Sequence, residues 1–327
     1  MLRVLALCLG VAACGRIGFD PGSSDGNASD GARVDVITGP QVVASFTPRA
    51  RNIAINATDV YWTNDDFTVM KCPLSGCGTT PTTLATNQFR ADGIAINATG
   101  VYWANYNDSV PSTVVGCSLS GCGAAPTTIA SNQIGPTSIV ADASNVYWSN
   151  FNDPSVQQCS TTTCNDTPIP LAVGFLAPWS LTVDGATVYF LQNTGTGGVF
   201  TCPVSSCPAG PTRLTSSQIN PGDLVLDATH IYWTEFGGNR VWRCDRAACM
   251  TTGTVLADSE SNPSAIAVDN TTVYWTDQLG RIRTCGLDGC AKNPTTLISG
   301  QTGIGGIKVD ANAIYWARDG AIMKLAK

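Results

Sequence analysis

Short segments in which apolar and polar residues alternate run through most of the chain. Examples are GIAINAT at 93–99, SIVADAS at 138–144 and AIAVDNT at 265–271, each with apolar residues two apart and an Asn or Asp near its end. A period of two predicts strands, and the Asn or Asp predicts a tight turn. A second apolar segment follows at once, so the pattern predicts antiparallel strand pairs.

The second segment of each pair belongs to a phrase that occurs seven times. The copies are VYWTN at 60–64, VYWAN at 101–105, VYWSN at 146–150, VYFLQ at 188–192, IYWTE at 231–235, VYWTD at 273–277 and IYWAR at 314–318. Their starts are 41 to 45 residues apart, and a fixed period of this size predicts a repeat architecture. After most copies come a variable polar loop, a third strand, a pair of cysteines and a fourth strand such as PTTLAT at 81–86. Four antiparallel strands per repeat are typical of a propeller blade.

The two ends of the array indicate how the ring closes. The seventh copy is followed by AIMKLA at 321–326 and then lacks both the cysteine pair and a fourth strand. An isolated strand, VVASFT at 42–47, precedes the first copy and aligns with the fourth strands of the others. We therefore predict an all-β protein, a seven-bladed β-propeller over residues 41–327, whose N-terminal strand completes the last blade.

The VYWTD copy and its relatives resemble the YWTD repeats of low-density-lipoprotein-receptor propellers. In that family the motif lies on the second strand of each blade and has a structural role, so the resemblance implies a fold and no activity. Several copies depart from it at the fifth position, and the receptor propellers have six blades. The chain also resembles uncharacterised propeller lipoproteins of environmental bacteria, which carry no known activity.

Twelve cysteines occur as six C-x4-C pairs at nearly even intervals. Zinc and redox-active thiols are poor explanations, because pairs in separate blades point outward around a ring and six redox centres would be redundant. Export and even numbers favour disulfides across the turn between the third and fourth strands. The expected pairs are Cys72–Cys77, Cys117–Cys122, Cys159–Cys164, Cys202–Cys207, Cys244–Cys249 and Cys285–Cys290.

The N-terminal residues indicate export. Residues 1–13, MLRVLALCLGVAA, have one cation and then an apolar run that is shorter than the roughly 20 residues needed to span a bilayer. The following VAACG at 11–15 resembles the bacterial lipoprotein cleavage box, which implies that Cys14 is acylated and anchors the protein to the cell envelope, at the outer membrane or the cell surface. An ordinary signal peptide, with Cys14 as a stray thiol, is the alternative. Residues 14–40 are rich in Gly, Ser and Asp and predict a flexible linker.

Charge and histidine content exclude some functions. The chain has a formal net charge of −6 and no run of Lys or Arg, so nucleic acid is not an expected partner. His230 is the single histidine, and it occupies the turn between the first and second strands, where other repeats have ordinary turn residues. A nucleophile–histidine–acid site is therefore not expected.

Residues that recur in every repeat are expected to serve the scaffold, so the candidate binding residues are those that differ between repeats. They lie in loops between the second and third strands and between blades, which converge on one face of a propeller. Two loops share the pattern Asn-aromatic-Asn-Asp, at 105–108 and 150–153, and aromatic groups beside Asn and Asp suit a sugar or a protein interface. The candidate face comprises Arg90, Tyr106, Asp108, Phe151, Asp153, Trp179 and Phe236, with Phe89, Phe175, Arg49 and Arg51 beside it. At the position of Trp179 the other repeats have Arg51, Asp92, Thr137, Gly222, Ser264 and Gly305.

We expect a lipid-anchored, monomeric, non-enzymatic binding module that presents this face to an envelope protein or a surface glycan. The alternative is a calcium-dependent hydrolase or lactonase of the propeller type, and a purely structural role also stays open. Asp65, Asp66, Asp108 and Asp153 are oxygen donors of the kind that calcium takes, but no loop has the dense D-x-D-x-D spacing of a dedicated site. We therefore name no catalytic residue, metal ligand or cofactor.

Overall fold

The computed structural model describes residues 39–327 apart from 108–111, 163 and 208. The fold of these residues is all-β, with a single helix among them, α1 (Cys249–Thr252), in the cysteine turn of the fifth repeat. No helix in this part of the chain is long and apolar enough to cross a bilayer. Cys14 and the linker to residue 38 lie outside the described residues, so the predicted anchor stays a prediction.

The strands form six antiparallel sheets, of which five contain four consecutive strands each. The four-stranded sheets are β5–β8 (Ala91–Ile96, Val101–Asn105, Ser112–Cys117, Thr127–Gln133), β9–β12 (Pro136–Ala141, Asn145–Asn150, Ser155–Ser160, Ile169–Val173), β13–β16 (Pro178–Asp184, Thr187–Gln192, Gly198–Pro203, Thr212–Arg213), β17–β20 (Pro221–Leu226, His230–Glu235, Arg240–Asp245, Thr254–Ala257) and β21–β24 (Ile266–Val268, Thr272–Thr276, Ile282–Gly286, Thr295–Ile298). The sixth sheet has the order β25-β26-β1-β2-β3-β4, with bounds Ile307–Val309, Ala313–Ala326, Gln41–Ile55, Asp59–Asn64, Val69–Pro73 and Thr82–Ala85.

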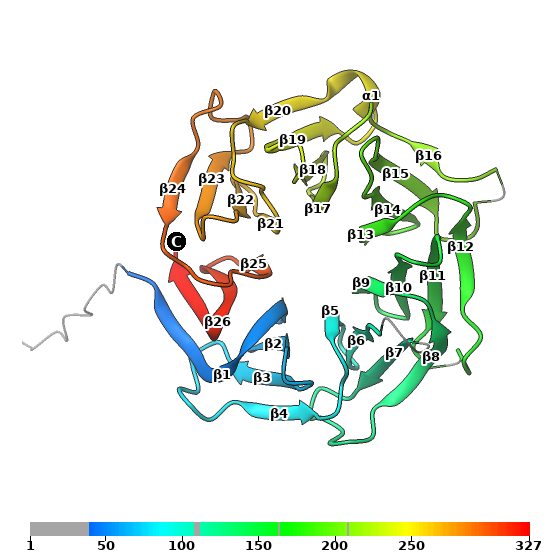
Figure 1. Ribbon diagram of the computed structural model, residues 1–327, viewed down its shortest axis with the longest axis vertical. Helices are drawn as coiled ribbons and strands as arrows, with labels where there is room; N and C mark the ends of the chain where they lie inside the picture. The colour runs from blue at the N-terminus through cyan, green and yellow to red at the C-terminus, as the bar shows by residue number, and fades with distance from the viewer. Residues whose placement is uncertain (1–38, 108–111, 163, 208) are drawn as a thin grey trace, which may run out of the picture. The chain divides into compact units, whose positions relative to one another are not determined.

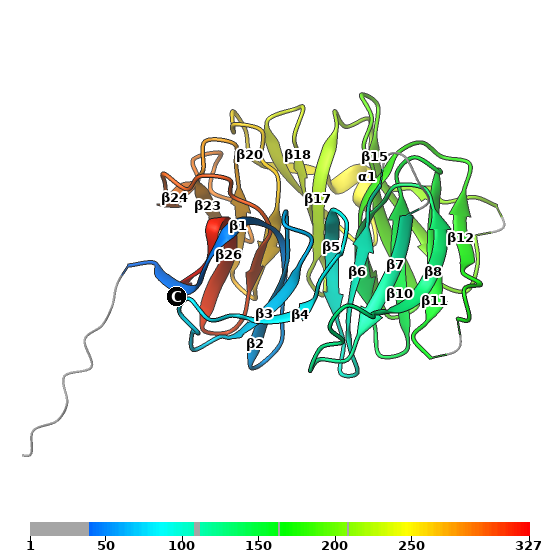
Figure 2. The same ribbon diagram turned by 60° about the horizontal axis from the view of Figure 1, so that its bottom comes forward.

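The sheets stand around a ring, as in a β-propeller. The first strand of each repeat, such as β5, β9, β13 and β17, lies nearest the centre, and the fourth, such as β4, β8 and β12, lies at the periphery (Figure 1). Turned toward its edge, the ring shows strands that run between its two faces (Figure 2). The innermost strands therefore surround a central channel, in which two cavities open.

The six-stranded sheet contains both ends of the array. The first part of β1 pairs with the last part of β26, from Gln41↔Lys324 to Arg49↔Asp319, and the second part of β1 pairs with β2. β26 returns toward its own start, because Lys327 N donates to Asn312 O at 3.0 Å. Gly320, at φ 72°, lies at the reversal, where a side chain would be strained.

One detail of the sequence prediction is wrong. Residues 42–47 were expected to form an isolated strand, but they continue without a break into the first strand of the first repeat. No Gly or Asn lies between residues 45 and 51 to make a turn, and the pairing instead shifts register between Ser45 and Arg49 and between Ala50 and Ile53. The single strand β1 thus pairs with β26 in its first part and with β2 in its second part, and its pairing is irregular between the two.

Aromatic residues of the repeated phrase hold neighbouring repeats together. Because successive side chains of a strand point to opposite faces, the Tyr and Trp of each copy enter different interfaces. In every interface the Tyr of one repeat shares a core cluster with the Trp or Phe of the next. The pairs, which close the circle among the described residues, are Tyr61 with Trp103, Tyr102 with Trp148, Tyr147 with Phe190, Tyr189 with Trp233, Tyr232 with Trp275, Tyr274 with Trp316, and Tyr315 with Trp62.

The buried indole N–H of this phrase has a repeated acceptor. In five repeats it donates to the side chain of a Gln or Glu that precedes it by 15 residues: Trp103 to Gln88, Trp148 to Gln133, Trp233 to Gln218, Trp275 to Glu260 and Trp316 to Gln301. The fourth repeat replaces both partners, since Phe190 stands for Trp and packs on Phe175 at 4.8 Å between ring centroids. Phe175, expected on the candidate face, is therefore partly buried and packs against the core.

The Asn and Asp residues before the second strand are turn residues, as their repetition predicted. In six repeats the side-chain oxygen accepts main-chain N–H groups two and three residues later, as in Asp142 from Ser144 at 2.8 Å and Asn145 at 2.7 Å. In the four of these repeats whose turn residue is Asp, the Tyr hydroxyl of the repeated phrase donates to the same carboxylate, as in Tyr147 to Asp142 at 2.7 Å. One Asx side chain thus fixes the turn and anchors the core tyrosine.

All six predicted cysteine pairs are disulfide-bonded. Each bridge also lies against the outer strand of the preceding repeat. The main-chain N–H of Cys122 donates to Leu84 O at 3.0 Å, and that of Cys77 donates to Val43 O at 2.9 Å. Val43 therefore lies beside the first repeat where Leu84, a fourth-strand residue of the first repeat, lies beside the second. The bridges indicate an oxidising compartment.

We predict that Gln218→Leu lowers the free energy of unfolding by about 1–3 kcal/mol, because the buried indole N–H of Trp233 then has no acceptor. Chemical denaturation of the purified protein measures the change. Gln278→Leu makes the same substitution at an exposed position and is expected to stay within about 0.5 kcal/mol of the parent. Equal losses in the two variants would contradict the role of the indole hydrogen bond.

Candidate binding site at the channel mouth

A cavity of about 520 Å³ opens where the first strands of the repeats begin. We call this end of the channel the channel mouth. Its lining includes one equivalent residue from every repeat: Arg51, Asp92, Thr137, Trp179, Gly222, Ser264 and Gly305. These seven residues occupy equivalent positions in the sequence repeats, and all seven line this one cavity. Its size is within the range of about 300–1,000 Å³ that is usual for ligand sites.

The repeated phrase positions several of these lining residues. The hydroxyl at its fourth position donates to the main-chain carbonyl of the lining residue in the next repeat. The bonds are Thr63 to Asp92 O at 3.0 Å, Ser149 to Trp179 O at 2.7 Å and Thr234 to Ser264 O at 2.7 Å. The scaffold thus fixes the backbone at the channel mouth and leaves the side chains free to differ.

Close backbone packing also shapes the mouth. A Cβ on Gly305 would lie 2.3 Å from the carbonyl oxygen of Arg51, and one on Gly306 would lie 2.3 Å from the side-chain oxygen of Asn52. Only glycine allows the segment before β25 to approach β1 this closely. The part of the cavity wall formed by residues 305 and 306 therefore presents main chain.

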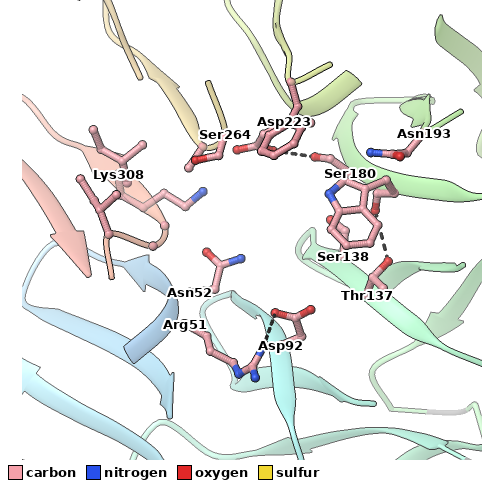
Figure 3. A pocket seen from close by; sticks show the side chains of 18 of the residues that line it. Arg51, Asn52, Asp92, Thr137, Ser138, Ser180, Asn193, Asp223, Ser264 and Lys308 are labelled. Carbon is pink, nitrogen blue, oxygen red and sulfur yellow. Dashed lines mark hydrogen bonds and ion pairs between the residues drawn. The ribbon is translucent and has the colours of Figure 1, made fainter. Parts of the chain in front are cut away.

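Charged groups of both signs line the cavity. The cations are Arg49, Arg51 and Lys308, and the anions are Asp92 and Asp223. Figure 3 shows Arg51 beside Asp92 and Ser180 beside Asp223, with the side chain of Lys308 extending from β25 into the cavity. Asp223 accepts from Ser180 Oγ at 2.6 Å, from Leu224 N at 2.9 Å and from Ile266 N at 3.1 Å. This carboxylate therefore links three repeats and is largely committed to the scaffold.

Asp92, unlike Asp223, interacts mainly with charged side chains and is affected by burial. Burial raises the pKa of its carboxyl, against the lowering effect of Arg51 and Arg90. About 35% of its side-chain surface is exposed, in the wall of the cavity, so the effect of burial is only partial. Arg51 lies 4.0 Å from Asp92 and also forms an ion pair with Asp65.

Aromatic residues extend the site from the cavity along one side of its rim. Trp179 is 37% exposed and lines the cavity. The ring of Phe151 meets it edge-on, with 5.4 Å between centroids. Farther along, the guanidinium of Arg90 lies 4.7 Å from the ring centroid of Tyr106, whose hydroxyl accepts a hydrogen bond from Asn152 at 3.2 Å. Four of the predicted residues thus form two contacting pairs.

The other predicted residues are more scattered. Phe236 lines the cavity, whereas Asp153 is exposed and does not line it, and Asp108 lies outside the described residues. Phe89 stacks on Phe67 with 5.1 Å between centroids, and neither residue lines the cavity. The predicted face is therefore smaller than expected and is centred on Trp179.

Some polar residues at the ends of second strands, next to the variable loops, are part of the scaffold. Asn64, Asn150 and Glu235 keep at most 2% of their surface exposed. Asn150 donates to Gln133 at 2.9 Å, and Glu235 accepts from Ile219 N and from Trp242 Nε1, both at 2.7 Å. They occupy the fifth position of the repeated phrase, where the polar side chain faces the core side of the loop.

His230 remains a turn residue. It lies at the start of β18, at the opposite end of the first strand from the cavity, and its ring contacts Thr229 at 2.7 Å and Asp245 at 3.1 Å. Within the described part of the chain, no three His, Cys, Asp or Glu side chains gather as they do around a metal ion. The four carboxylates named as oxygen donors include Asp108, which lies outside that part.

Sequence analysis missed Asn52, Ser180, Asp223 and Lys308, which also line the cavity. Lys308 offered a signal, because it lies two residues before the turn Asp310, where the other repeats have small or apolar residues. The other three resemble ordinary strand residues, and only the assembled ring brings them together.

No protein-family model and no curated protein matches the chain. Solved structures do resemble it. Virginiamycin B lyase from Staphylococcus aureus is 14% identical, with a TM-score of 0.71, and the match covers 88% of this chain and 99% of the lyase. The WD40 β-propeller domain of Doa1 is 12% identical, with a TM-score of 0.68 and coverage of 89% and 98%. The computationally designed Ika8 protein is 13% identical, with a TM-score of 0.60 and coverage of 88% and 100%. These likenesses show that the fold is a β-propeller.

We predict that Asp92→Asn raises the free energy of unfolding relative to the parent at pH 7. The pKa of this carboxyl is raised in the folded state, so ionisation destabilises the fold as pH rises above about 4, the usual pKa of Asp. The amide removes this penalty, and the advantage should vanish near pH 3, where the carboxyl is protonated in both states. Urea unfolding at the two pH values measures it.

The matched control is Asp153→Asn, the same change on an exposed loop. It should alter stability little at either pH. An Asp92→Asn variant that is less stable than the parent at pH 7 would show that the ion pair with Arg51 outweighs burial.

Proposed function

We propose that this protein is an exported, non-enzymatic binding module whose channel mouth takes up a surface glycan. The observation that carries the proposal is the cavity itself, which combines an exposed tryptophan with hydroxyl, amide, carboxylate and cationic groups. An aromatic face suits the apolar face of a sugar ring, and the polar groups suit its hydroxyls. The rim formed by Phe151, Tyr106 and Arg90 would extend contacts to further sugar units.

The proposal includes a ring of seven blades. The six-stranded sheet counts as two blades, one formed by β25, the two arms of β26 and the start of β1, the other by the rest of β1 with β2, β3 and β4. The cyclic series of Tyr and Trp pairs supports this count, because each of the seven copies contributes to two interfaces. The resemblance to YWTD repeats is in keeping with a structural role for these residues.

We also propose that the protein is attached to the bacterial cell envelope through acylated Cys14, at the outer membrane or the cell surface, and acts as a monomer. The disulfides support an oxidising location. The linker that follows Cys14 would hold the propeller away from the bilayer, so that the channel mouth can meet extended polymers.

A second candidate function is a hydrolase or lactonase of the propeller type. One observation favours it: burial raises the pKa of Asp92 in the cavity, and carboxyl groups with raised pKa values serve as acids in active sites. One structural neighbour is a virginiamycin B lyase, solved with Quinupristin, that is catalytically inactive after a histidine was replaced by alanine. The single histidine of this chain lies away from the cavity, which favours binding over that chemistry.

We predict that replacing Tyr106, Phe151 and Trp179 by Ala lowers glycan affinity by about tenfold or more, because stacking and buried apolar area are lost. Binding to immobilised envelope glycans, measured by interferometry with and without calcium, provides the readout. The control replaces Phe67 and Phe89 by Ala, which removes a stacked exposed pair outside the cavity.

Unchanged glycan binding by the triple variant would contradict the proposed binding site. Retention of an envelope protein, lost in the triple variant but not in the control, would replace the glycan by a protein partner. Calcium-dependent turnover of the bound material would instead favour the hydrolase.

We predict that Cys14→Ser moves the protein from the membrane fraction to the soluble fraction, because it removes the only thiol available for acylation at the cleavage box. Cell fractionation followed by mass spectrometry of the N-terminal peptide measures both location and lipid mass. Cys8→Ser, within the predicted signal peptide, is the control and should leave anchoring intact. An anchored Cys14→Ser protein would contradict the lipoprotein assignment.

A further inference from the structure

Lys308 lies at the middle of the channel. It lines the cavity at the channel mouth and also a second cavity of about 490 Å³ toward the other end of the channel. It is the one residue common to the linings of these two cavities. The side chain of Lys308 is therefore accessible to a ligand that enters from the channel mouth.

Lys308 departs from its equivalents in the other repeats. Two residues before the turn Asn or Asp, the other six have Ala54, Ala95, Val140, Thr182, Val225 and Ala267. Of these, Thr182, Val225 and Ala267 border the second cavity, whereas Ala54, Ala95 and Ala267 belong to the core clusters between repeats. The fold thus accepts a small side chain here, and the lysine is not required by the repeat.

The ammonium group has no protein counter-charge. Among the described residues, none forms a hydrogen bond or an ion pair with Lys308 Nζ, whereas the two arginines of the cavity have acidic partners. Arg49 lies 3.8 Å from Asp319, and Arg51 pairs with Asp65 and Asp92. Asp223, the other carboxylate of the cavity, is already occupied by three donors. An ammonium group that lines a cavity without a protein partner is available to an anionic ligand.

We propose that the glycan bound at the channel mouth is acidic, and that Lys308 binds its anionic group while Trp179 stacks on a sugar ring. This inference rests on the proposed function, because it names the ligand class of the same cavity. Lysine is a compact charge without the forked geometry of arginine, so both a carboxylate and a sulfate fit it.

The charges that line the cavity favour binding of an anion, although the net charge of the whole chain is negative. Three cationic and two anionic side chains line the cavity, in a chain whose formal net charge is −6. Screening acts over about 8 Å at physiological ionic strength, so a group inside the cavity responds mainly to the charges that line it. Salt should weaken binding only modestly, since the pair forms in a partly buried site.

The test compares oligogalacturonate with its fully methyl-esterified form, which keeps the sugar backbone and removes the charge. Isothermal titration of the full chain is the readout, with a sulfated neutral oligosaccharide as a third probe. We expect the parent to bind the acid form more tightly than the ester. Lys308→Met should weaken binding of the acid form about ten- to hundredfold and leave the ester unchanged, because a charge-assisted hydrogen bond is lost.

Two variants keep the result interpretable. Lys292→Met removes the same charge from an exposed position, where Lys292 pairs with Asp258 at 3.0 Å, and should bind all probes like the parent. Lys308→Arg restores a cation and should recover part of the affinity. Stronger binding of the sulfated probe than of the acid form would assign sulfate as the anionic group.

The failures of the two proposals can be told apart. Equal affinity of the parent for acid and ester, with both lost in Trp179→Ala, would overturn the acidic ligand and keep the glycan site. Binding that does not change in Trp179→Ala would overturn the glycan site itself. Absence of measurable binding to every anionic probe would count against the acidic ligand, and binding of the ester alone would do the same.

Discussion

The apolar core that the tyrosine of one repeat shares with the tryptophan or phenylalanine of the next is the interaction on which the rest of this structure depends. A single four-stranded sheet cannot cover its own apolar faces, so each repeat needs a neighbour on both sides. The alternation of side chains along the second strand sends Tyr to one neighbour and Trp to the other. The series closes when Tyr315 packs with Trp62, which joins the end of the array to its beginning. The channel exists because that circle closes.

The same phrase connects the scaffold to the site. In the third copy, for example, Tyr147 is held by the turn carboxylate Asp142, Trp148 by Gln133, and Ser149 by the carbonyl of Trp179 in the next repeat. That carbonyl belongs to a residue of the channel mouth, so the backbone there is fixed by repeated contacts while the side chains vary. The fourth repeat departs most, with Phe190 and Phe175 in its core and Trp179 at the cavity. Lys308 is a second departure, in the seventh repeat. Both departures lie in one cavity, and this coincidence is the basis of the proposed glycan site.

The repeated features of the fold were predictable from the sequence, because each is encoded seven times or nearly so. The strand order, the turn role of the Asx residues and the six disulfides follow from local patterns of that kind. The continuity of β1 was not predictable, since it depends on how one strand bends between two sets of partners. The burial of Asn64, Asn150 and Glu235 was missed because polar residues in a variable segment resemble loop residues. Lys308 could have been found by the rule that identified Trp179, had the rule been applied to strands as well as to loops.

Hydrogen–deuterium exchange of the purified chain, with and without saturating acidic oligosaccharide, tests most directly whether departures from the repeat mark the binding site. The account predicts added protection in peptides that contain Arg51, Trp179 and Lys308, which lie in separate repeats and meet only at the channel mouth. Peptides that contain the Asx turns at Asn97, Asp142, Asp227 and Asp269, in repeats that supply none of these three residues, should exchange as they do in the free protein. Protection confined to those turns, or to the outer strands near the disulfides, would contradict the account.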